Sequence, residues 1–171
     1  MTSVVLIGVP GAGKSTIGEL LAAHLGMLFV DSDHVIEERA GKAISDIFTT
    51  DGEPAFRALE AQTIADVLSG PDAIVSLGGG ALGNESTREL VKSHTVLWLQ
   101  TGLAQAVDRV GLNRNRPLLL GNVRGQLAAL MTAREPIYRE AADVVVDTSE
   151  LSIEQVTQAA LAALAEVGIA P

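Results

Sequence analysis

Apolar and polar positions in this chain fall into blocks, and their spacing changes from one block to the next. Compact apolar runs rich in Val, Leu and Ile predict five strands, at residues 3–8, 27–31, 73–77, 95–100 and 143–147. Strands covered on both faces have this composition because neither face meets water. Between them, apolar residues at helical spacing predict helices at about 14–25, 33–40, 52–69, 85–93, 103–110, 124–141 and 152–166.

This alternation of strands and helices is typical of an α/β domain with a parallel sheet. The length of 171 residues is near the usual size of one domain. No internal repeat, low-complexity tract or linker divides the chain. We therefore expect residues 1–171 to form a single domain.

One stretch, residues 111–123, fits neither a strand nor a helix. It combines a glycine near each end with a proline and two arginines. A loop of this length in a compact domain is usually functional or disordered. Its arginines favour a mobile lid over a ligand site, and the alternative is an ordinary surface loop.

The composition narrows the classes of function. With 47% hydrophobic and 19% charged residues, the chain can bury a core and is not expected to be disordered. It has no cysteine, so disulfides and thiolate chemistry are excluded. The formal net charge of −9 argues against a nucleic-acid partner. The apolar run at residues 3–7 is too short to cross a membrane and follows no basic segment, so we expect a cytoplasmic protein and, at this size, a monomer.

A phosphate-binding motif occupies residues 8–16, which match the P-loop pattern G-x-x-x-x-G-K-[ST] in full. Its glycines allow a tight turn in which successive N–H groups point at phosphates. Lys14 is expected to reach the β- and γ-phosphates of ATP, and the Ser15 hydroxyl to ligate Mg²⁺. The predicted nucleotide-binding residues of this loop are Gly11, Ala12, Gly13, Lys14, Ser15 and Thr16. An apolar strand precedes the loop and an amphipathic helix follows it, so we predict a three-layer P-loop sandwich: a five-stranded parallel sheet with helices on both faces.

A P-loop predicts a nucleotide but not a reaction. Asp31 and Asp33 follow an apolar run, at the strand end where open α/β sheets bind ligands. In an extended segment both side chains would point to the same side, with Asp31 holding Mg²⁺ through water and Asp33 contacting the attacking hydroxyl. The alternative is that Asp33 only caps the helix that follows.

Two further segments suggest a pocket for the phosphoryl acceptor. Arg57 and Glu60 lie three residues apart on a predicted helix. They form either an exposed ion pair or a clamp in which Glu60 orients Arg57 toward a substrate carboxylate. The run Gly78–Gly80 directly follows a buried strand and would bring bare backbone up to a ligand. Ser76, just before it, lies either near the metal or in the core.

Taken in order, the motifs resemble those of the shikimate kinases. The matching blocks are the P-loop, D-S-D at 31–33, G-E-P-A-F-R-A-L-E at 52–60, G-G-G at 78–80, R-P-L-L at 116–119 and R-x-P-x-Y at 134–138. Together they cover about residues 3–148. The resemblance implies transfer of the γ-phosphoryl group of ATP to shikimate with Mg²⁺, giving shikimate 3-phosphate and ADP, a step of aromatic amino-acid biosynthesis.

The resemblance also implies roles for individual residues. Asp33 is the proposed base, Lys14 and Arg116 supply positive charge at the reacting phosphate, and Arg109 stacks on adenine. Shikimate contacts are implied for Asp33, Arg57, Glu60, Gly79, Gly80 and Arg134, for the apolar walls Phe48 and Phe56, and for Pro117 and Leu118 of the lid. The segment 147–151 departs from the family pattern after the last strand, which puts the adenine contacts there in doubt.

Three other functions fit the sequence less well. A gluconate kinase would keep the P-loop but has no reason to combine the 52–60 block with two arginines that clamp a carboxylate. A GTPase should carry an N-K-x-D motif, and none of the three lysines follows an asparagine. A catalytically inactive nucleotide-binding module would be expected to have lost Lys14, Asp33 or Arg116, and all three are present.

Overall fold

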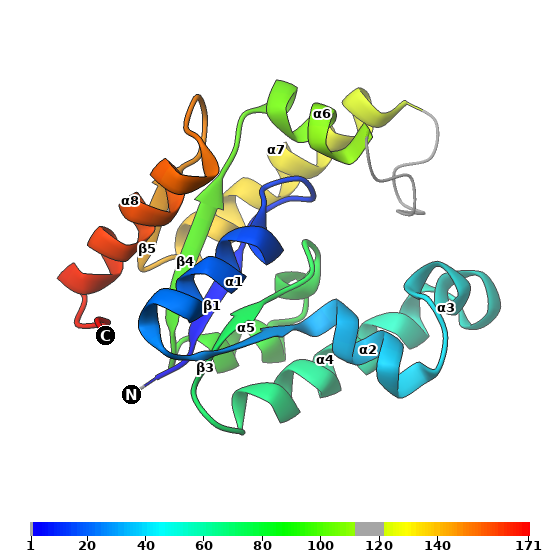
Figure 1. Ribbon diagram of the computed structural model, residues 1–171. Helices are drawn as coiled ribbons and strands as arrows, with labels where there is room; N and C mark the ends of the chain where they lie inside the picture. Colours follow the sequence, from blue (N-terminus) through cyan, green and yellow to red (C-terminus); the bar gives the residue numbers. More distant parts are fainter. Residues whose placement is uncertain (1, 112–121) are drawn as a thin grey trace.

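The computed structural model describes residues 2–111 and 122–171 (Figure 1). Its five strands are β1 (Val4–Ile7), β2 (Leu28–Asp31), β3 (Ala73–Ser76), β4 (Thr95–Gln100) and β5 (Val144–Asp147). They form one sheet in the order β2-β3-β1-β4-β5, and every neighbouring pair is parallel. All five strands lie where the apolar runs predicted them.

Eight α-helices and one short 3-10 helix are present in the described part of the chain. They are α1 (Lys14–Leu25), α2 (Ser32–Ala40), α3 (Ile44–Asp51), α4 (Glu53–Leu68), η1 (Ala81–Gly83), α5 (Glu85–Val91), α6 (Leu103–Gly111), α7 (Val123–Ala141) and α8 (Ile153–Glu166). The seven predicted helices are confirmed, with ends that differ by one or two residues.

The sheet separates two apolar cores. Strand β1 contributes side chains to both of them, which explains why its sequence is apolar without interruption. Val4 and Leu6 belong to a core shared with α1 and α8. Val5 and Ile7 belong to a second core, on the opposite face, that includes residues of α4, α5 and α7. Since successive side chains of a strand point to opposite faces, each residue of β1 must be apolar. Helices therefore cover both faces, as predicted (Figure 1).

Helices α2, α3 and α4 enclose a third, smaller apolar cluster beside the sheet. Its buried members are Ile36, Ile47 and Phe56. Helix α3 was not predicted, because it is short and begins after Ala43 without a side-chain cap. Its apolar residues do follow helical spacing, so the signal was present but spans only two turns.

The ends of the strands explain where a ligand site forms. In a parallel sheet all the carboxyl ends lie at one edge. Here β1 leads into the P-loop, β2 ends at Asp31, and β3 leads into the glycine run 78–80. Three segments far apart in sequence are thus placed side by side, at the edge where open α/β sheets bind ligands.

The structure does not describe every residue for which a role is predicted. Most of the predicted lid, including Arg116, Pro117 and Leu118, lies outside them. Among the residues that are described, no helix combines the length and the apolar character that a membrane span requires.

Candidate active site

The P-loop turns from β1 into α1 through glycines in left-handed conformations. Gly11 has φ 85° and Gly13 has φ 87°, values that other residues rarely adopt. Lys14, the first residue of α1, donates from Nζ to the carbonyls of Gly8 at 2.7 Å and Val9 at 3.2 Å. Its ammonium is therefore held over the loop, beside the N-terminal end of a helix, where anions are favoured.

A cavity of about 470 Å³ opens beside the P-loop, in the range typical of small-molecule sites. Its wall contains all six of the predicted nucleotide-binding residues of the loop, and also Asp31, Asp33, Ser76, Gly78, Gly79 and Arg109. It continues to Thr148, Ile153 and Val156. The wall is thus polar beside the P-loop, and at α8 it is formed by the apolar side chains of Ile153 and Val156.

Arg109 joins α6 to the P-loop at the edge of this cavity. Its Nη1 donates to the carbonyl of Gly11 at 3.0 Å. Since Gly11 is part of the phosphate-binding loop, this bond fixes the guanidinium beside the space that a nucleotide would occupy.

Asp31 connects the P-loop to strand β2. It accepts a hydrogen bond from the Ser15 hydroxyl at 2.9 Å and one from the backbone N–H of Asp33 at 3.0 Å. The second bond makes Asp31 the N-cap of α2, so the alternative in which Asp33 caps this helix is wrong. The predicted extended geometry is also wrong, because α2 begins at Ser32. Both carboxylates nevertheless line the same cavity.

The side chains of Ser15 and Asp31 are chemically suited to Mg²⁺. They present a hydroxyl and a carboxylate within 2.9 Å of each other, and Mg²⁺ prefers oxygen ligands. Within residues 2–111 and 122–171, no group of three or more His, Asp or Glu side chains could hold a metal. This arrangement fits an ion that is held partly by phosphate oxygens better than one held in an all-protein cage.

The run Gly78–Gly80 is surrounded by charged side chains that leave no room for a Cβ. A Cβ on Gly78 would lie 2.9 Å from Asp33 Oδ1 and 3.0 Å from Glu60 Oε2. On Gly79 it would lie 2.8 Å from Arg134 Nη1, and on Gly80 2.6 Å from Arg57 Nη2. Gly79 also abuts the P-loop, because its Cβ would be 3.1 Å from Pro10 Cδ.

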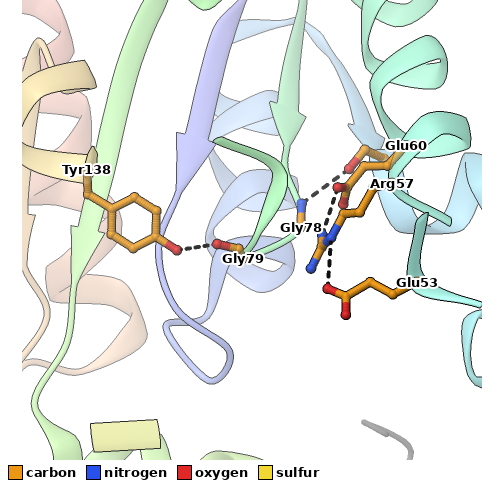
Figure 2. A network of polar contacts seen from close by, with 7 residues as sticks. Glu53, Arg57, Glu60, Gly78, Gly79 and Tyr138 are labelled. Atoms are coloured by element: carbon orange, nitrogen blue, oxygen red, sulfur yellow. Dashed lines mark hydrogen bonds and ion pairs between the residues drawn. The ribbon is translucent and has the colours of Figure 1, made fainter. Parts of the chain in front are cut away.

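Arg57 and Glu60 form a partly buried ion pair, 2.8 Å between Nη1 and Oε1, on one face of α4 (Figure 2). The side chain of Glu60 is only 4% exposed and that of Arg57 27% exposed, so the alternative of a freely exposed pair is wrong. Burial raises the pKa of Glu60, although the hydrogen bond from Arg57 acts in the opposite direction. Arg57 Nε also lies 3.5 Å from Glu53 Oε1.

Two phenylalanines lie next to this pair. The rings of Phe48 and Phe56 are 4.7 Å apart at their centroids, and the guanidinium of Arg57 lies 5.2 Å from the centre of the Phe56 ring. Phe56 is buried and Phe48 half-buried. Two apolar side chains therefore adjoin the charged groups around Gly80, and Phe48 is the more accessible of the two.

Arg134 reaches the same place from the opposite side, on α7. Its charge acts on Glu60, and its Nη1 lies close to Gly79. Two cations, Arg57 and Arg134, therefore flank the glycine run from different helices. Such a pair can bind a carboxylate, because the guanidinium fork matches its geometry.

The predicted residues are thus divided between two adjoining regions. The cavity beside the P-loop is lined by the residues predicted to bind the nucleotide and the metal, together with Asp33 and Gly79. The residues outside the wall of that cavity are Arg57, Glu60, Gly80, Arg134, Phe48 and Phe56. The glycine run joins the two regions. Sequence reasoning gave no role to Ser32, whose hydroxyl accepts from the N–H of Gly78 at 3.3 Å, or to Tyr138, which contacts Gly79.

Comparison with known proteins identifies the family of this chain. The shikimate kinase family model matches residues 10–165. The shikimate kinase of Thermobifida fusca is 51% identical over 154 residues, or 90% of each chain. That of Rhodococcus jostii is 46% identical over 163 residues, covering 95% of this chain and 97% of the other. The chain belongs to the shikimate kinase family.

Solved structures of the family have the same fold. Shikimate kinase from Acinetobacter baumannii in complex with shikimate gives a TM-score of 0.94 at 33% identity, over 99% of this chain and 96% of the other. The enzyme from Aquifex aeolicus gives 0.85 at 30% identity, over 99% and 100%. A gluconokinase from Sinorhizobium meliloti gives 0.61 at 20% identity, over 97% and 93%, and this likeness shows the fold alone. The predicted family and fold are confirmed.

Replacing Gly80 by alanine tests whether the glycine run positions Arg57. The new Cβ would overlap the guanidinium, which is the flexible end of a side chain, so the fold should persist while Arg57 shifts. The assay uses shikimate as the acceptor, because the chain belongs to the shikimate kinase family. We expect KM for shikimate to rise roughly 10- to 100-fold, as for loss of one hydrogen bond to a charged group. KM for ATP should change little.

Gly83→Ala is the matched control, because nothing lies within 4 Å of a Cβ at Gly83. It should behave as wild type. Equal effects of the two substitutions, or a normal KM for shikimate in Gly80→Ala, would contradict the role given to the glycine run.

The raised pKa of Glu60 predicts a pH-dependent stability. Because the fold favours the protonated carboxyl, the stabilisation due to Glu60 is fully present below its unfolded-state pKa, 4.5. It is lost as the pH rises through the higher folded-state value. The free energy of unfolding of wild type, minus that of Glu60→Gln, should therefore fall as the pH rises from about 4 through the folded-state pKa of Glu60. Urea unfolding of both proteins measures this, and a difference that rises with pH would contradict it.

Proposed function

We propose that this chain transfers the γ-phosphoryl group of ATP to the 3-hydroxyl of shikimate, with the residues of the two adjoining regions in the roles given below. Membership of the shikimate kinase family supports the reaction. The single observation that supports the residue roles is the convergence on Gly78–Gly80 of Asp33, Glu60, Arg57 and Arg134, directly against the P-loop.

The nucleotide occupies the cavity beside the P-loop. Its phosphates accept from the N–H groups of residues 11–16 and from Lys14, at the positive end of α1. Its base lies toward Arg109 and the apolar side chains of Ile153 and Val156, where the cavity continues beyond the phosphate end. This direction brings the γ-phosphate toward Asp33 and Gly79.

Shikimate lies on the far side of the glycine run, with its carboxylate between Arg57 and Arg134. Each guanidinium can donate a pair of hydrogen bonds to a carboxylate. Glu60 holds Arg57 in place, and Phe48 and Phe56 cover the apolar part of the ring. The backbone N–H groups of Gly79 and Gly80 donate to the hydroxyls.

The chemistry needs alignment and positive charge more than a strong base. The acceptor oxygen attacks the γ-phosphorus, the bond to the β-phosphate oxygen breaks, and the hydroxyl proton leaves. In a loose transition state charge accumulates on the phosphate oxygens. Lys14 stabilises this charge, and Asp33 orients the hydroxyl and accepts its proton.

Ser15 and Asp31 would hold Mg²⁺ together with phosphate oxygens. When bound, the ion neutralises charge on the β- and γ-phosphates. The hydrogen bond between Ser15 and Asp31 supports this assignment, because two oxygen groups so close together can share one ion, directly or through water.

Roles for the lid follow from the family resemblance. We propose that Arg116 adds positive charge at the γ-phosphate and that Pro117 and Leu118 close over shikimate, which would exclude water from the site. We further propose that residues 1–171 act as one domain and as a cytoplasmic monomer. The net charge of −9 agrees with small-molecule partners and not with nucleic acid.

Release of ADP from Mg·ATP tests the reaction, with shikimate, gluconate or no acceptor added. We expect release that depends on shikimate alone. Lys14→Ala should lower kcat by at least about 100-fold, since a positioned charge at the reacting phosphate contributes several kcal/mol. This variant also controls for contaminating kinases. Release with gluconate, release without acceptor, or full activity of Lys14→Ala would each contradict the proposal.

A further inference from the structure

The buried hydroxyl of Tyr138 takes no part in the functions proposed so far. Tyr138 lies on α7 and is 3% exposed. Its hydroxyl donates to the carbonyl of Gly79 at 2.6 Å (Figure 2). The two residues are 59 positions apart in the sequence, so this bond ties α7 to the loop that joins the nucleotide and acceptor regions.

The backbone hydrogen bonds of the glycine run show why this contact matters. The N–H of Gly78 donates to Ser32, and the carbonyls of Gly78 and Gly80 accept from Ala81 and Gly83. The Gly79 carbonyl is held by Tyr138. Among the described residues, no protein group accepts from the N–H of Gly79 or Gly80. These are the two donors proposed to bind the hydroxyls of shikimate.

Peptide geometry links the tyrosine to one of these donors. The carbonyl of Gly79 and the N–H of Gly80 belong to the same planar peptide unit and point in opposite directions when the bond is trans. No cis peptide bond occurs in the described residues. A hydrogen bond that fixes the Gly79 carbonyl therefore also fixes the direction of the Gly80 N–H. Without it, two glycines in succession could rotate freely, since glycine restricts its backbone least.

Tyr138 is also close to the second cation of the acceptor region. Arg134 lies one helical turn before it, so both side chains lie on the same face of α7. The guanidinium of Arg134 fills the space beside Gly79. Tyr138 thus fixes the backbone of Gly79, beside which the Arg134 guanidinium lies. Both residues approach this glycine from the same helix.

We propose that Tyr138 is a positioning residue for the phosphoryl acceptor, acting through the Gly79–Gly80 peptide and Arg134. This inference rests on the proposed function. The hydroxyl of Tyr138 is engaged with a backbone carbonyl, and burial raises its pKa to about 12. The hydroxyl therefore stays a donor throughout the neutral pH range.

The simplest variant is Tyr138→Phe, which removes one oxygen and keeps the ring that packs 5.8 Å from the ring of Trp98. We expect kcat/KM for shikimate to fall by about tenfold, the effect of one hydrogen bond, with KM for ATP unchanged. Ser3→Ala is the matched control, because it removes a buried hydroxyl that accepts from a backbone N–H at the opposite edge of the sheet. It should leave kcat/KM for shikimate unchanged.

A double-mutant cycle with Arg134→Lys separates positioning from general destabilisation. If Tyr138 acts partly through Arg134, loss of its hydroxyl should lower kcat/KM by clearly less than tenfold in the Arg134→Lys background. Strictly additive effects would contradict the inference. So would a normal kcat/KM for shikimate in Tyr138→Phe, a matching rise in KM for ATP, or an equal loss in Ser3→Ala.

A measurement on the unmutated sequence covers the case in which the variant does not fold. Tyr138 is the one tyrosine in the chain, so labelling with 3-fluorotyrosine gives one fluorine-19 signal. We expect this signal to shift when shikimate saturates the protein and not when gluconate is added. An unchanged signal at saturating shikimate, in a preparation whose ADP release depends on shikimate, would overturn the role of Tyr138 and leave the proposed function intact.

Discussion

The site depends on one steric constraint, the missing side chains at residues 78–80. Four charged side chains from α2, α4 and α7 occupy the space that three Cβ atoms would otherwise take. Only because this backbone is bare can two arginines approach it closely while it also touches the P-loop. In the proposed function, the phosphate site and the acceptor site are thus two sides of one short loop. In-line transfer requires such an arrangement, since donor and acceptor must be held within bonding reach of each other.

The charges around this loop explain how an acidic protein binds two anionic substrates. The net charge is −9, but the cations Lys14, Arg57, Arg109 and Arg134 are gathered where anions are proposed to bind. The carboxylates of Asp31, Asp33 and Glu60 lie among them and add local negative charge. The local field governs a site more than the total charge does. Burying Glu60 costs free energy, and the ion pair with Arg57 offsets part of that cost. The pair also leaves Arg57 oriented before any substrate arrives, which reduces the entropy lost on binding.

Most of the fold and much of the site could be predicted from the sequence, for definite physical reasons. A strand buried on both faces must be apolar throughout, as β1 is, and the P-loop has a pattern that few other functions require. The expectation that every strand is covered on both faces was wrong for the outer strands β2 and β5, which leave Leu28 and Val145 exposed. The features that could not be predicted depend on contacts between distant segments, on which of two nearby residues caps a helix, or on a pattern too short to recognise. The bond from Tyr138 to Gly79 joins two elements with no shared sequence signal. The capping of α2 by Asp31 rather than Asp33 depends on where β2 stops, and helix α3 is too short for its pattern to stand out.

A crystal structure of the protein with shikimate and ADP bound tests the central claim most directly. The account predicts the shikimate carboxylate between Arg57 and Arg134, a ring hydroxyl within hydrogen-bond distance of Asp33, and the N–H groups of Gly79 and Gly80 directed at the ligand. Shikimate bound away from the glycine run, or with its carboxylate contacting neither arginine, would contradict it.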